Sequence, residues 1–413
     1  MVPVRQKFPA SPPLDVRAEL RRRFRPPVKR GARIAVGVGS RGITNLSAVV
    51  AETIALLKEA GAIPFLVPAM GSHGGATPEG QMQLLAEYGV TEDAMGAPFR
   101  PSMETVSLGP TEDGVDVRFS RAAIESDGIV VINRVKPHTD FGGPVGSGIM
   151  KMIAIGLGKR EGAAAYHAAA SRLGMERILR TVLKVVLPRV PLLAGIALLE
   201  DTFHATARIA VLPPEEIEAR EAQLQIEARR LMPRLPFDEV DLLIIDRMGK
   251  NISGAGMDPN ITGRDVHGYT SNLSEQTARP LLRRVYVREL TPESHGNAIG
   301  IGMADFTTSR LVRAIDAAVT TMNVITSLTI NNFKIPMAFE SDREAVPRIL
   351  ETVPLQDGRA HRVVRIQDTL NLEKVEVSES YAEELRKRTD LEPLGPARDL
   401  SFDPQGNLLP IGT

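Results

Sequence analysis

The chain has 413 residues, which predicts two to three domains and ample length for hydrophobic cores. Lys and Arg together number 50, as do Asp and Glu, and this zero net charge disfavours a basic nucleic-acid binder or a polybasic membrane-surface protein. Cysteine is absent, which excludes disulfides, thiolate metal sites and cysteine nucleophiles.

The N-terminus, MVPVRQKFPASPPL, lacks the apolar core of a signal peptide. No run of apolar residues reaches the roughly 18 needed to span a bilayer. We therefore expect a soluble, cytoplasmic protein that binds neither membranes nor nucleic acid.

Strand and helix patterns alternate along the first half of the chain. An apolar run at 33–39 predicts a buried parallel strand, and Thr44 is placed to cap a helix that ends near Glu59. Further strands are predicted at 63–67 and 127–135. This alternation predicts an α/β fold with a mostly parallel sheet flanked by helices.

Three turns follow these strands, at 39–43, 69–77 and 136–148. Sites in open parallel sheets form at the carboxyl ends of the strands. The three turns are therefore expected to converge on one crevice.

A charged amphipathic helix is predicted at 213–230, and the Pro-rich segment 231–236 then breaks the pattern. A new strand at 240–246 begins a second α/β region. We place a domain boundary near residue 235, with domains at 1–235 and 236–395.

The second domain repeats the α/β style, with helices predicted at about 308–323, 343–353 and 378–389. The tail, 396–413, is rich in Pro and Gly. Packing of this tail against the first domain is one arrangement that the sequence allows. With two such domains, we expect the active site in the cleft between them.

Three of the seven histidines occur in segments suited to chemistry. His73 lies between glycines, His138 follows a predicted strand in the sequence Lys-Pro-His, and His167 lies in an Ala-rich helix. Histidine is the side chain best suited to proton transfer near neutral pH and is also the commonest metal ligand. For a single histidine the plainer reading is an ordinary surface or core residue, and for His167 alone that reading would prevail.

A glycine-rich segment, FGGPVGSGIMK, leads to Lys151. Its backbone N–H groups are suited to a phosphate, although it lacks the Gly-Lys-Ser/Thr ending of a P-loop. Lys151 is flanked by apolar residues, so it is a candidate nucleophile or covalent anchor, with a helix-edge lysine as the plainer reading.

Two cations follow predicted strands. Arg41 lies in the turn after the first strand, where its guanidinium could bind a carboxylate or a phosphate. Lys250 lies after the first strand of the second domain. A solvated loop residue is the alternative for each.

The order of Arg41, His73, Lys-Pro-His at 136–138, Lys151 and His167 resembles the lactate racemase family of nickel-pincer-nucleotide enzymes. The resemblance covers most of the chain and is densest from 33 to 170.

The resemblance implies a role for each residue. Lys151 matches the lysine joined covalently to the nickel-pincer nucleotide, a pyridinium-derived mononucleotide, and His167 matches the protein's ligand to nickel. The cofactor supplies a carbon and two sulfurs, so one imidazole completes a square-planar site. His73 and His138 match the two acid/base histidines. Arg41 and Lys250 match the cations that bind the substrate.

The implied reaction is racemisation or epimerisation of a 2-hydroxy acid by proton-coupled hydride transfer. One histidine takes the hydroxyl proton, the Cα hydride moves to the cofactor, and hydride returns to the opposite face. The family also implies cofactor-maturation enzymes as partners.

The loop from His138 to Lys151 is longer than in the lactate-specific enzymes, and the Gly-Ser-His-Gly-Gly sequence at His73 also departs from their pattern. The resemblance therefore implies the reaction type rather than lactate itself. A straight helix would place Lys151 and His167 about 160° apart, so we expect the chain to break at Gly156 and Gly158.

Two other functions stay open. A nicotinamide-dependent 2-hydroxy acid dehydrogenase would use GVGSRG at 37–42 as a dinucleotide turn, but no carboxylate ends the next strand. A non-catalytic protein that binds a nucleotide or sugar acid would need Arg41 and the glycine-rich loops, whereas His73 and His138 would be dispensable.

Overall fold

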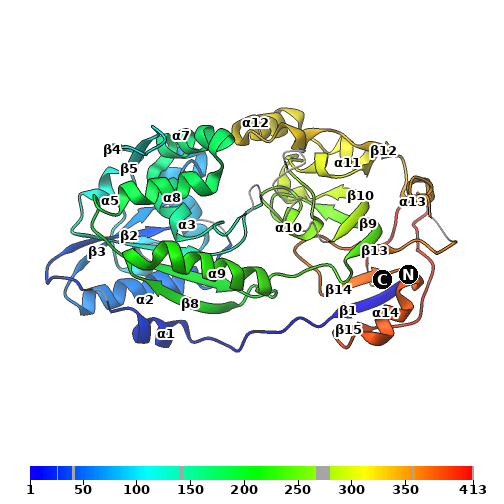
Figure 1. Ribbon diagram of the computed structural model, residues 1–413, viewed down its shortest axis with the longest axis horizontal. Helices are drawn as coiled ribbons and strands as arrows, with labels where there is room; N and C mark the ends of the chain where they lie inside the picture. Colours follow the sequence, from blue (N-terminus) through cyan, green and yellow to red (C-terminus); the bar gives the residue numbers. More distant parts are fainter. Residues whose placement is uncertain (26, 40–41, 140–142, 267–279, 356–357, 412–413) are drawn as a thin grey trace. The chain divides into compact units, whose positions relative to one another are not determined.

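The computed structural model describes residues 1–25, 27–39, 42–139, 143–266, 280–355 and 358–411 (Figure 1). Contacts divide the chain into two compact units. The first unit is Ala10–Met232, and the second combines Met1–Pro9 with Pro233–Thr413. Within the described ranges, no helix is long and apolar enough to cross a membrane.

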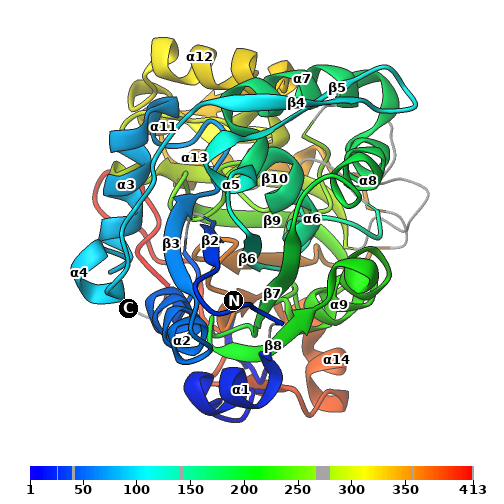
Figure 2. The ribbon, with the colours of Figure 1, turned by 90° about the vertical axis from the view of Figure 1, so that its left-hand side faces the viewer.

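The first unit is built on a five-stranded sheet (Figure 2). Four of its strands run parallel to their neighbours, and the last is antiparallel to the fourth. The predicted strands at 33–39, 63–67 and 127–135 are all present. In spatial order the strands are β3 (Ile63–Pro68), β2 (Arg33–Val38), β6 (Gly128–Arg134), β7 (Leu192–Glu200) and β8 (Thr206–Leu212).

Helices and one hairpin complete this unit. They are α1 (Val16–Arg23), α2 (Leu46–Glu59), η1 (Gly74–Ala76), α3 (Pro78–Glu87), α4 (Glu92–Met95), the hairpin β4 (Thr105–Pro110) and β5 (Asp116–Ser120), α5 (Arg121–Ile124), α6 (Ile149–Lys151), the π-helical turn η2 (Met152–Gly156), α7 (Leu157–Leu173), α8 (Met175–Val186), η3 (Pro214–Glu216) and α9 (Ile217–Leu231).

Side chains of the sheet alternate between two cores. Ile34 and Val36 of β2 pack with α1 and α2, whereas Ala35 packs with α7, α8 and α9 on the other face. Because helices cover both faces, the strands are apolar along nearly their whole length. The predicted α/β class, with mostly parallel strands flanked by helices, is confirmed.

The helix predicted to be capped by Thr44 begins instead at Leu46. Its N-cap is Asn45, which has a left-handed backbone with φ of 61° and no side-chain capping bond. The Thr44 N–H donates to Oε1 of Glu200 at 2.7 Å. This tertiary contact holds the backbone two residues before the helix.

The second unit contains an eight-stranded mixed sheet. Five strands at one side are parallel, and three at the other are antiparallel. In spatial order they are β12 (Met337–Phe339), β11 (Phe306–Thr308), β10 (Leu281–Leu290), β9 (Glu239–Met248), β13 (Val363–Ile366), β14 (Lys374–Val377), β1 (Val2–Gln6) and β15 (Leu391–Pro393).

Short helices connect these strands. They are α10 (Pro259–Thr262), η4 (Pro292–Ser294), η5 (Ile301–Met303), α11 (Ser309–Arg313), α12 (Ala317–Ser327), η6 (Ile330–Phe333), α13 (Asp342–Glu351), η7 (Glu379–Tyr381) and α14 (Ala382–Lys387). The helix predicted at about 308–323 is thus two helices, because the side chain of Asp316 accepts from the Val319 N–H and starts a new one.

The N-terminal residues lie in the second unit, although the sequence placed them in the first domain. Strand β1 is inserted between β14 and β15, with Val4 opposite both Val375 and Pro393. Val4 and Gln6 are buried there. A single short strand carries no information about which sheet it will join, so only its tertiary pairing could reveal this.

The C-terminal tail also packs within the second unit rather than on the first. Leu408 is buried with Leu242 and Tyr286, its N–H donates to Oδ2 of Asp342 at 2.8 Å, and its carbonyl accepts from Arg288 at 2.7 Å. Buried charges of the second unit thus bind the tail backbone.

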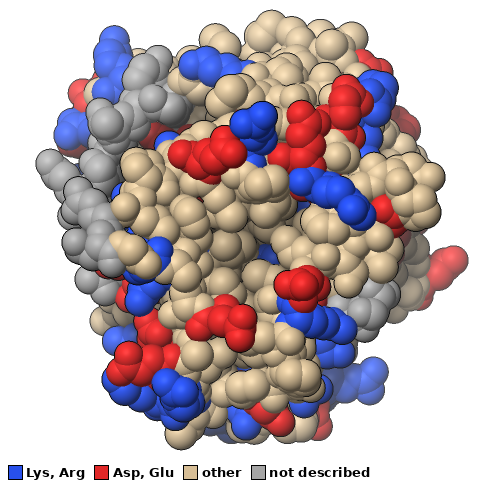
Figure 3. Space-filling view, turned by 90° about the vertical axis from the view of Figure 1, so that its right-hand side faces the viewer, with Lys and Arg blue, Asp and Glu red and all other residues tan. Residues whose placement is uncertain are grey.

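On the face shown in Figure 3, basic and acidic side chains are interspersed, without a broad patch of one sign.

Candidate functional site

The strands that precede the predicted site turns end at one edge of the sheet of the first unit. Strands β2, β3 and β6 are parallel, so their carboxyl ends, and the turns that follow them, share one edge of the sheet. The predicted substrate-binding residue Arg41, in the turn after β2, lies outside the described residues.

The turn after β6 forms a loop closed at its neck. Lys136 and Ser147 exchange two backbone hydrogen bonds of 2.9 Å, so the two ends of the loop lie side by side. His138 follows one end, and α6, which carries Lys151, follows the other. The closed neck brings these two residues together although they are 13 positions apart.

Lys151 and His138 are in direct contact. Nζ of Lys151 lies 2.5 Å from Nε2 of His138. Burial, together with the positive charges of Lys151, Lys136 and His167, lowers the pKa of His138 well below 6.5. The imidazole is therefore neutral near pH 7 and able to accept a proton.

The segment from Lys151 to His167 is helical but not a straight α-helix. The π-helical turn η2 follows α6, and α7 has a non-helical residue at Lys159, with φ of 55° and ψ of −156°. We expected the break at Gly156 and Gly158, but it falls at Lys159. Single π-turns inside helices occur frequently at functional sites, because they re-aim the side chains around them. His167 itself is exposed on α7.

His73 lies in the turn after β3, where it is exposed. Its carbonyl accepts from Nε2 of the buried Gln81 at 3.2 Å, and the same nitrogen donates to Gly71 at 3.0 Å. The Gly71 N–H donates in turn to the Gly156 carbonyl at 3.1 Å. The turn that leads into His73 is therefore bonded to the helical segment that carries Lys151 and His167.

Lys250 belongs to the second unit. Its ammonium donates to the Gly254 carbonyl at 2.8 Å, and its backbone N–H donates to Oγ of Ser294 at 2.9 Å. Its assignment to substrate binding stays a prediction.

A buried carboxylate that the sequence analysis missed lies under α6. Glu221 of α9 is fully buried and accepts from the Met150 N–H at 2.9 Å. Burial raises the pKa of Glu221 to about 7. A Cβ at Gly148 would lie 2.4 Å from Oε1 of Glu221, so a larger residue at this position would displace the carboxyl group. The carboxyl group thus fixes the start of the helix that presents Lys151.

Two buried amides support the same loop. Nε2 of Gln225, one turn after Glu221, donates to the carbonyls of Ser147 at 3.0 Å and Lys136 at 3.2 Å. Nδ2 of Asn133 donates to the Gly148 carbonyl at 3.0 Å. The loop neck is therefore held from both α9 and the end of β6.

The sequence carried a weak signal for this support. Glu221 and Gln225 share a helix face with Ile217, Leu224 and Ala228, all of them buried. A carboxylate and an amide on the apolar face of a helix are rare, because burying them requires hydrogen-bond partners. The pattern was interpreted only as a charged amphipathic helix.

The side chains of the candidate site suit a metal whose ligands are supplied mostly by a cofactor. Among the described residues, no group of three or more His, Asp or Glu side chains could hold a metal ion. Lys151 offers a primary amine and His167 one imidazole. A nickel-pincer nucleotide needs one amine for attachment and one nitrogen ligand, so these residues suit it.

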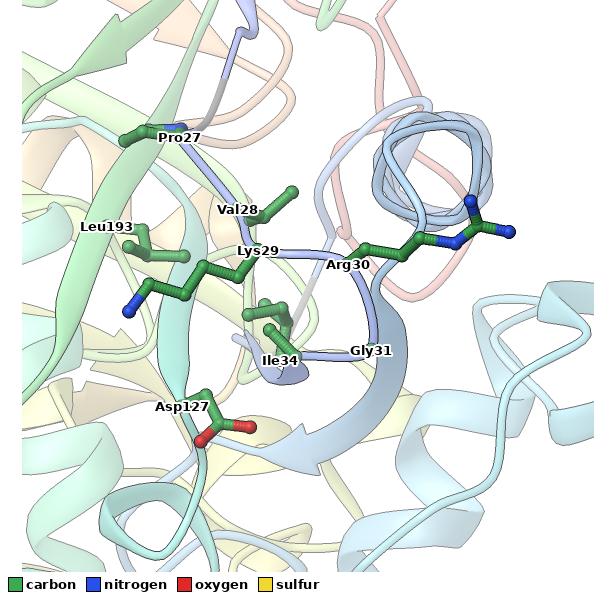
Figure 4. Close-up of a pocket in the computed structure, with 9 residues that line it drawn as sticks. Pro27, Val28, Lys29, Arg30, Gly31, Ile34, Asp127 and Leu193 are labelled. Carbon is green, nitrogen blue, oxygen red and sulfur yellow. The ribbon is translucent and has the colours of Figure 1, made fainter.

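A separate hollow of about 420 Å³ lies at the opposite ends of the same strands (Figure 4). It is lined by residues that precede or begin β2, β6 and β7, including Lys29, Arg30, Asp127 and Leu193. Because sites of this fold form at the carboxyl ends, this hollow is not the candidate site.

Comparison with known proteins identifies one related family model and two similar structures. Residues 28–176 match the model of a family described as lactate racemase N-terminal domain. This segment contains Arg41, His73, His138, Lys151 and His167 but not Lys250. No curated protein sequence matches the chain.

Two solved structures are similar. The lactate racemase apoprotein from Thermoanaerobacterium thermosaccharolyticum is 13% identical, with 89% of this chain and 93% of that chain covered and a TM-score of 0.53. A protein from Thermotoga maritima is 15% identical over 77% of this chain and 81% of that one, with a TM-score of 0.47. The first likeness shows that the fold is shared. Residues 28–176 of the chain thus resemble the lactate racemase N-terminal domain, and the chain shares the fold of the lactate racemase apoprotein.

Proposed function

We propose that the protein is a racemase or epimerase of a 2-hydroxy acid that uses a nickel-pincer nucleotide held by Lys151 and His167. The observation that carries the proposal is the contact of 2.5 Å between Nζ of Lys151 and Nε2 of His138. It joins an amine suited to covalent attachment and a neutral imidazole, within the segment that matches the lactate racemase N-terminal domain and also contains His167.

Lys151 is assigned to the covalent link and His167 to the single protein ligand of nickel. When bound, the cofactor would supply an acceptor for the hydrogen of the substrate's Cα–H bond together with its two electrons. The protein needs no further metal ligands for this, which agrees with the small donor set of the described residues.

His138 is assigned to the proton of the substrate hydroxyl. Burial holds its pKa well below 6.5, so it is in the basic form at neutral pH. Inversion at Cα presents the hydroxyl in two orientations, and each needs its own proton acceptor and donor. His73 is assigned to the second orientation.

Arg41 and Lys250 are proposed to bind the substrate carboxylate and its neighbouring oxygens. A buried carboxylate requires such paired cations. The substrate is proposed to be a small 2-hydroxy acid, with cofactor-maturation enzymes as partners of the protein in the cell.

The test is the mass of the protein co-produced with a cofactor-making pathway. We expect a nucleotide-sized adduct on Lys151 after digestion and about one nickel ion per chain. K151R should lack the adduct, whereas K184R, at an exposed lysine of α8, should carry it. H167A should keep the adduct and lose nickel.

The loaded protein should interconvert the enantiomers of a 2-hydroxy acid, and H138A should lower the rate by about 100-fold or more. An unmodified Lys151 without nickel, in a host that loads another family member, would overturn the proposal.

A further inference from the structure

Lys159 combines two features that are each unfavourable for stability. Its side chain is fully buried, and its backbone has φ of 55° and ψ of −156°, inside a helix. This backbone region is almost restricted to glycine, because the Cβ of other residues crowds the neighbouring peptide groups. A lysine there is strained.

The ammonium of Lys159 has no acidic partner in the described part of the chain. Its one hydrogen bond there is donated by Nζ to the Pro68 carbonyl, at 2.5 Å. Burial lowers the pKa of Lys159 to about 8, and no nearby carboxylate opposes this shift. A methionine would fill nearly the same volume without the desolvation cost.

The acceptor of this hydrogen bond lies at a functionally relevant place. Pro68 ends β3, and the turn after it leads to His73. The Gly71 N–H of that turn donates to the Gly156 carbonyl at 3.1 Å. A Cβ at Gly156 would lie 2.6 Å from the Ala69 carbonyl oxygen, so turn and helix are packed backbone to backbone.

These contacts form a junction between the turn at 68–71 and the helical segment at 156–159. Lys159 lies eight residues after Lys151 and eight residues before His167. The junction therefore fixes the helix midway between the two proposed cofactor residues, against the turn that precedes His73.

We propose that Lys159 is a positioning residue, whose bond from the ammonium to the Pro68 carbonyl sets the place of the His73 turn relative to the helix of Lys151 and His167. A purely structural lysine would stabilise the fold. This one is held in a strained backbone without a counter-charge, so its presence is explained by geometry at the site rather than by stability. The role in turnover rests on the proposed function, but the tie between turn and helix does not.

The first experiment uses the protein without cofactor and compares K159M with K184M, an exposed lysine in α8. We expect the Tm of K159M to equal or exceed that of the wild type. Amide hydrogen exchange at residues 69–76 should become at least about tenfold faster, while exchange in the remaining sheet is unchanged. K184M should change neither quantity.

K159Q provides a second variant, because its shorter amide is a neutral donor. It should recover part of the protection at 69–76. A lower Tm for K159M together with faster exchange throughout the first unit would assign Lys159 to fold stability and overturn the proposal. Protection at 69–76 within about threefold of the wild type would overturn it as well.

The second experiment uses the loaded enzyme. We expect K159M to carry the Lys151 adduct and nickel as the wild type does, with kcat lowered by at least about tenfold and KM changed by less than about threefold. Unchanged kcat in K159M would refute the role in turnover. If the wild type itself carries no adduct, the proposed function fails, and the exchange experiment still decides whether Lys159 places the turn.

Discussion

Two sets of buried ionisable side chains, one in each unit, differ in their partners. In the first unit, Lys159 and Glu221 are fully buried, and no ion pair with either is present in the described ranges. In the second unit, Arg288 and Arg365 are buried together with three carboxylates. The charges of the second set are therefore compensated, whereas Lys159 and Glu221 are not.

The charges of the second unit form a chain of contacts. Arg288 pairs with Asp342 at 2.8 Å and with Asp246 at 2.7 Å, and Arg365 pairs with Asp246 at 2.9 Å and with Glu376 at 3.0 Å. Good geometry and full pairing are what allow charges to be buried. Because the network also binds the tail backbone at Leu408, it joins the sheet to the end of the chain.

Glu221 and Lys159 both lie near the candidate site. Glu221 fixes the start of the Lys151 helix, Lys159 bonds to the end of β3, and His138 contacts Lys151. Buried groups with strongly shifted pKa values cluster at functional sites, although structural networks shift them too. The buried network of the second unit supplies counter-charges to its members, whereas the described part of the first unit supplies none to Glu221 or Lys159.

The largest expected effect comes from breaking the compensated network. D342A would leave Arg288 with one carboxylate fewer and remove the acceptor of the Leu408 N–H. We expect a loss of about 3–5 kcal/mol in the free energy of unfolding, measured with urea near pH 7. E340A, which removes an exposed carboxylate two residues away, is the matched control and should have little effect.

The pH dependence of that loss gives a second check. Burial raises the pKa of Asp342, but the hydrogen bond and charge of Arg288 outweigh it and lower the pKa below 3.8. A lowered folded pKa means that the contribution is present above pH 3.8 and disappears as the pH falls below it. The wild type and D342A should therefore converge in acid. Equal stability of the two at neutral pH would show that the network is dispensable.

E221Q is expected to raise the free energy of unfolding, by less than D342A lowers it. The glutamine can still accept from the Met150 N–H but carries no charge. Because the pKa of Glu221 rises from 4.5 to about 7, the favourable contribution of its protonated form is present below pH 4.5 and lost as the pH rises through 7. E221Q should thus be more stable than the wild type above pH 7, by at most about 3 kcal/mol.

Urea unfolding of the wild type and E221Q across this pH range measures the difference. The two should agree near pH 4.5 and diverge as the pH rises to 7. E215Q, at an exposed residue of η3 just before α9, serves as the control. A constant difference at all pH values would mean that the carboxylate is not the source of the penalty.

The smallest effect is expected for an exposed pair. Glu383 and Lys387 on α14 form an ion pair at 2.5 Å, but their side chains are 69% and 72% exposed. Water and salt screen such a pair, so E383A should leave the unfolding midpoint unchanged within error. A clear loss of stability would mean that burial is not what distinguishes the charges compared above.

Much of the fold followed from local patterns. Apolar runs marked β2, β3 and β6, and the alternation of strands and helices predicted the parallel sheet. Local patterns failed at several points. Asn45, in a left-handed conformation, precedes α2 in place of the predicted cap Thr44, whose N–H bonds to Glu200 on β7. The strand β1 and the tail lie in the second unit, through pairing with distant segments.

The candidate site divides in the same manner. Lys151, His138 and His167 were found because their residue types and order are distinctive within a short segment. Glu221, Gln225 and Lys159 were not found, because a Glu in a charged helix or a Lys after Gly resembles a solvated surface residue. Only burial, hydrogen-bond partners and backbone torsions distinguish them.

By itself, the sequence determined which residue types are available for chemistry and the periodicity of the elements that carry them, since both are local properties of the chain. The tertiary structure decided which of these residues meet, which charges lose their solvation and which backbone torsions are imposed. Those outcomes depend on contacts between residues far apart in sequence, such as Lys159 with Pro68 and Glu221 with Met150. No local pattern encodes such contacts, because their free energy arises only when the whole sheet and its helices are packed.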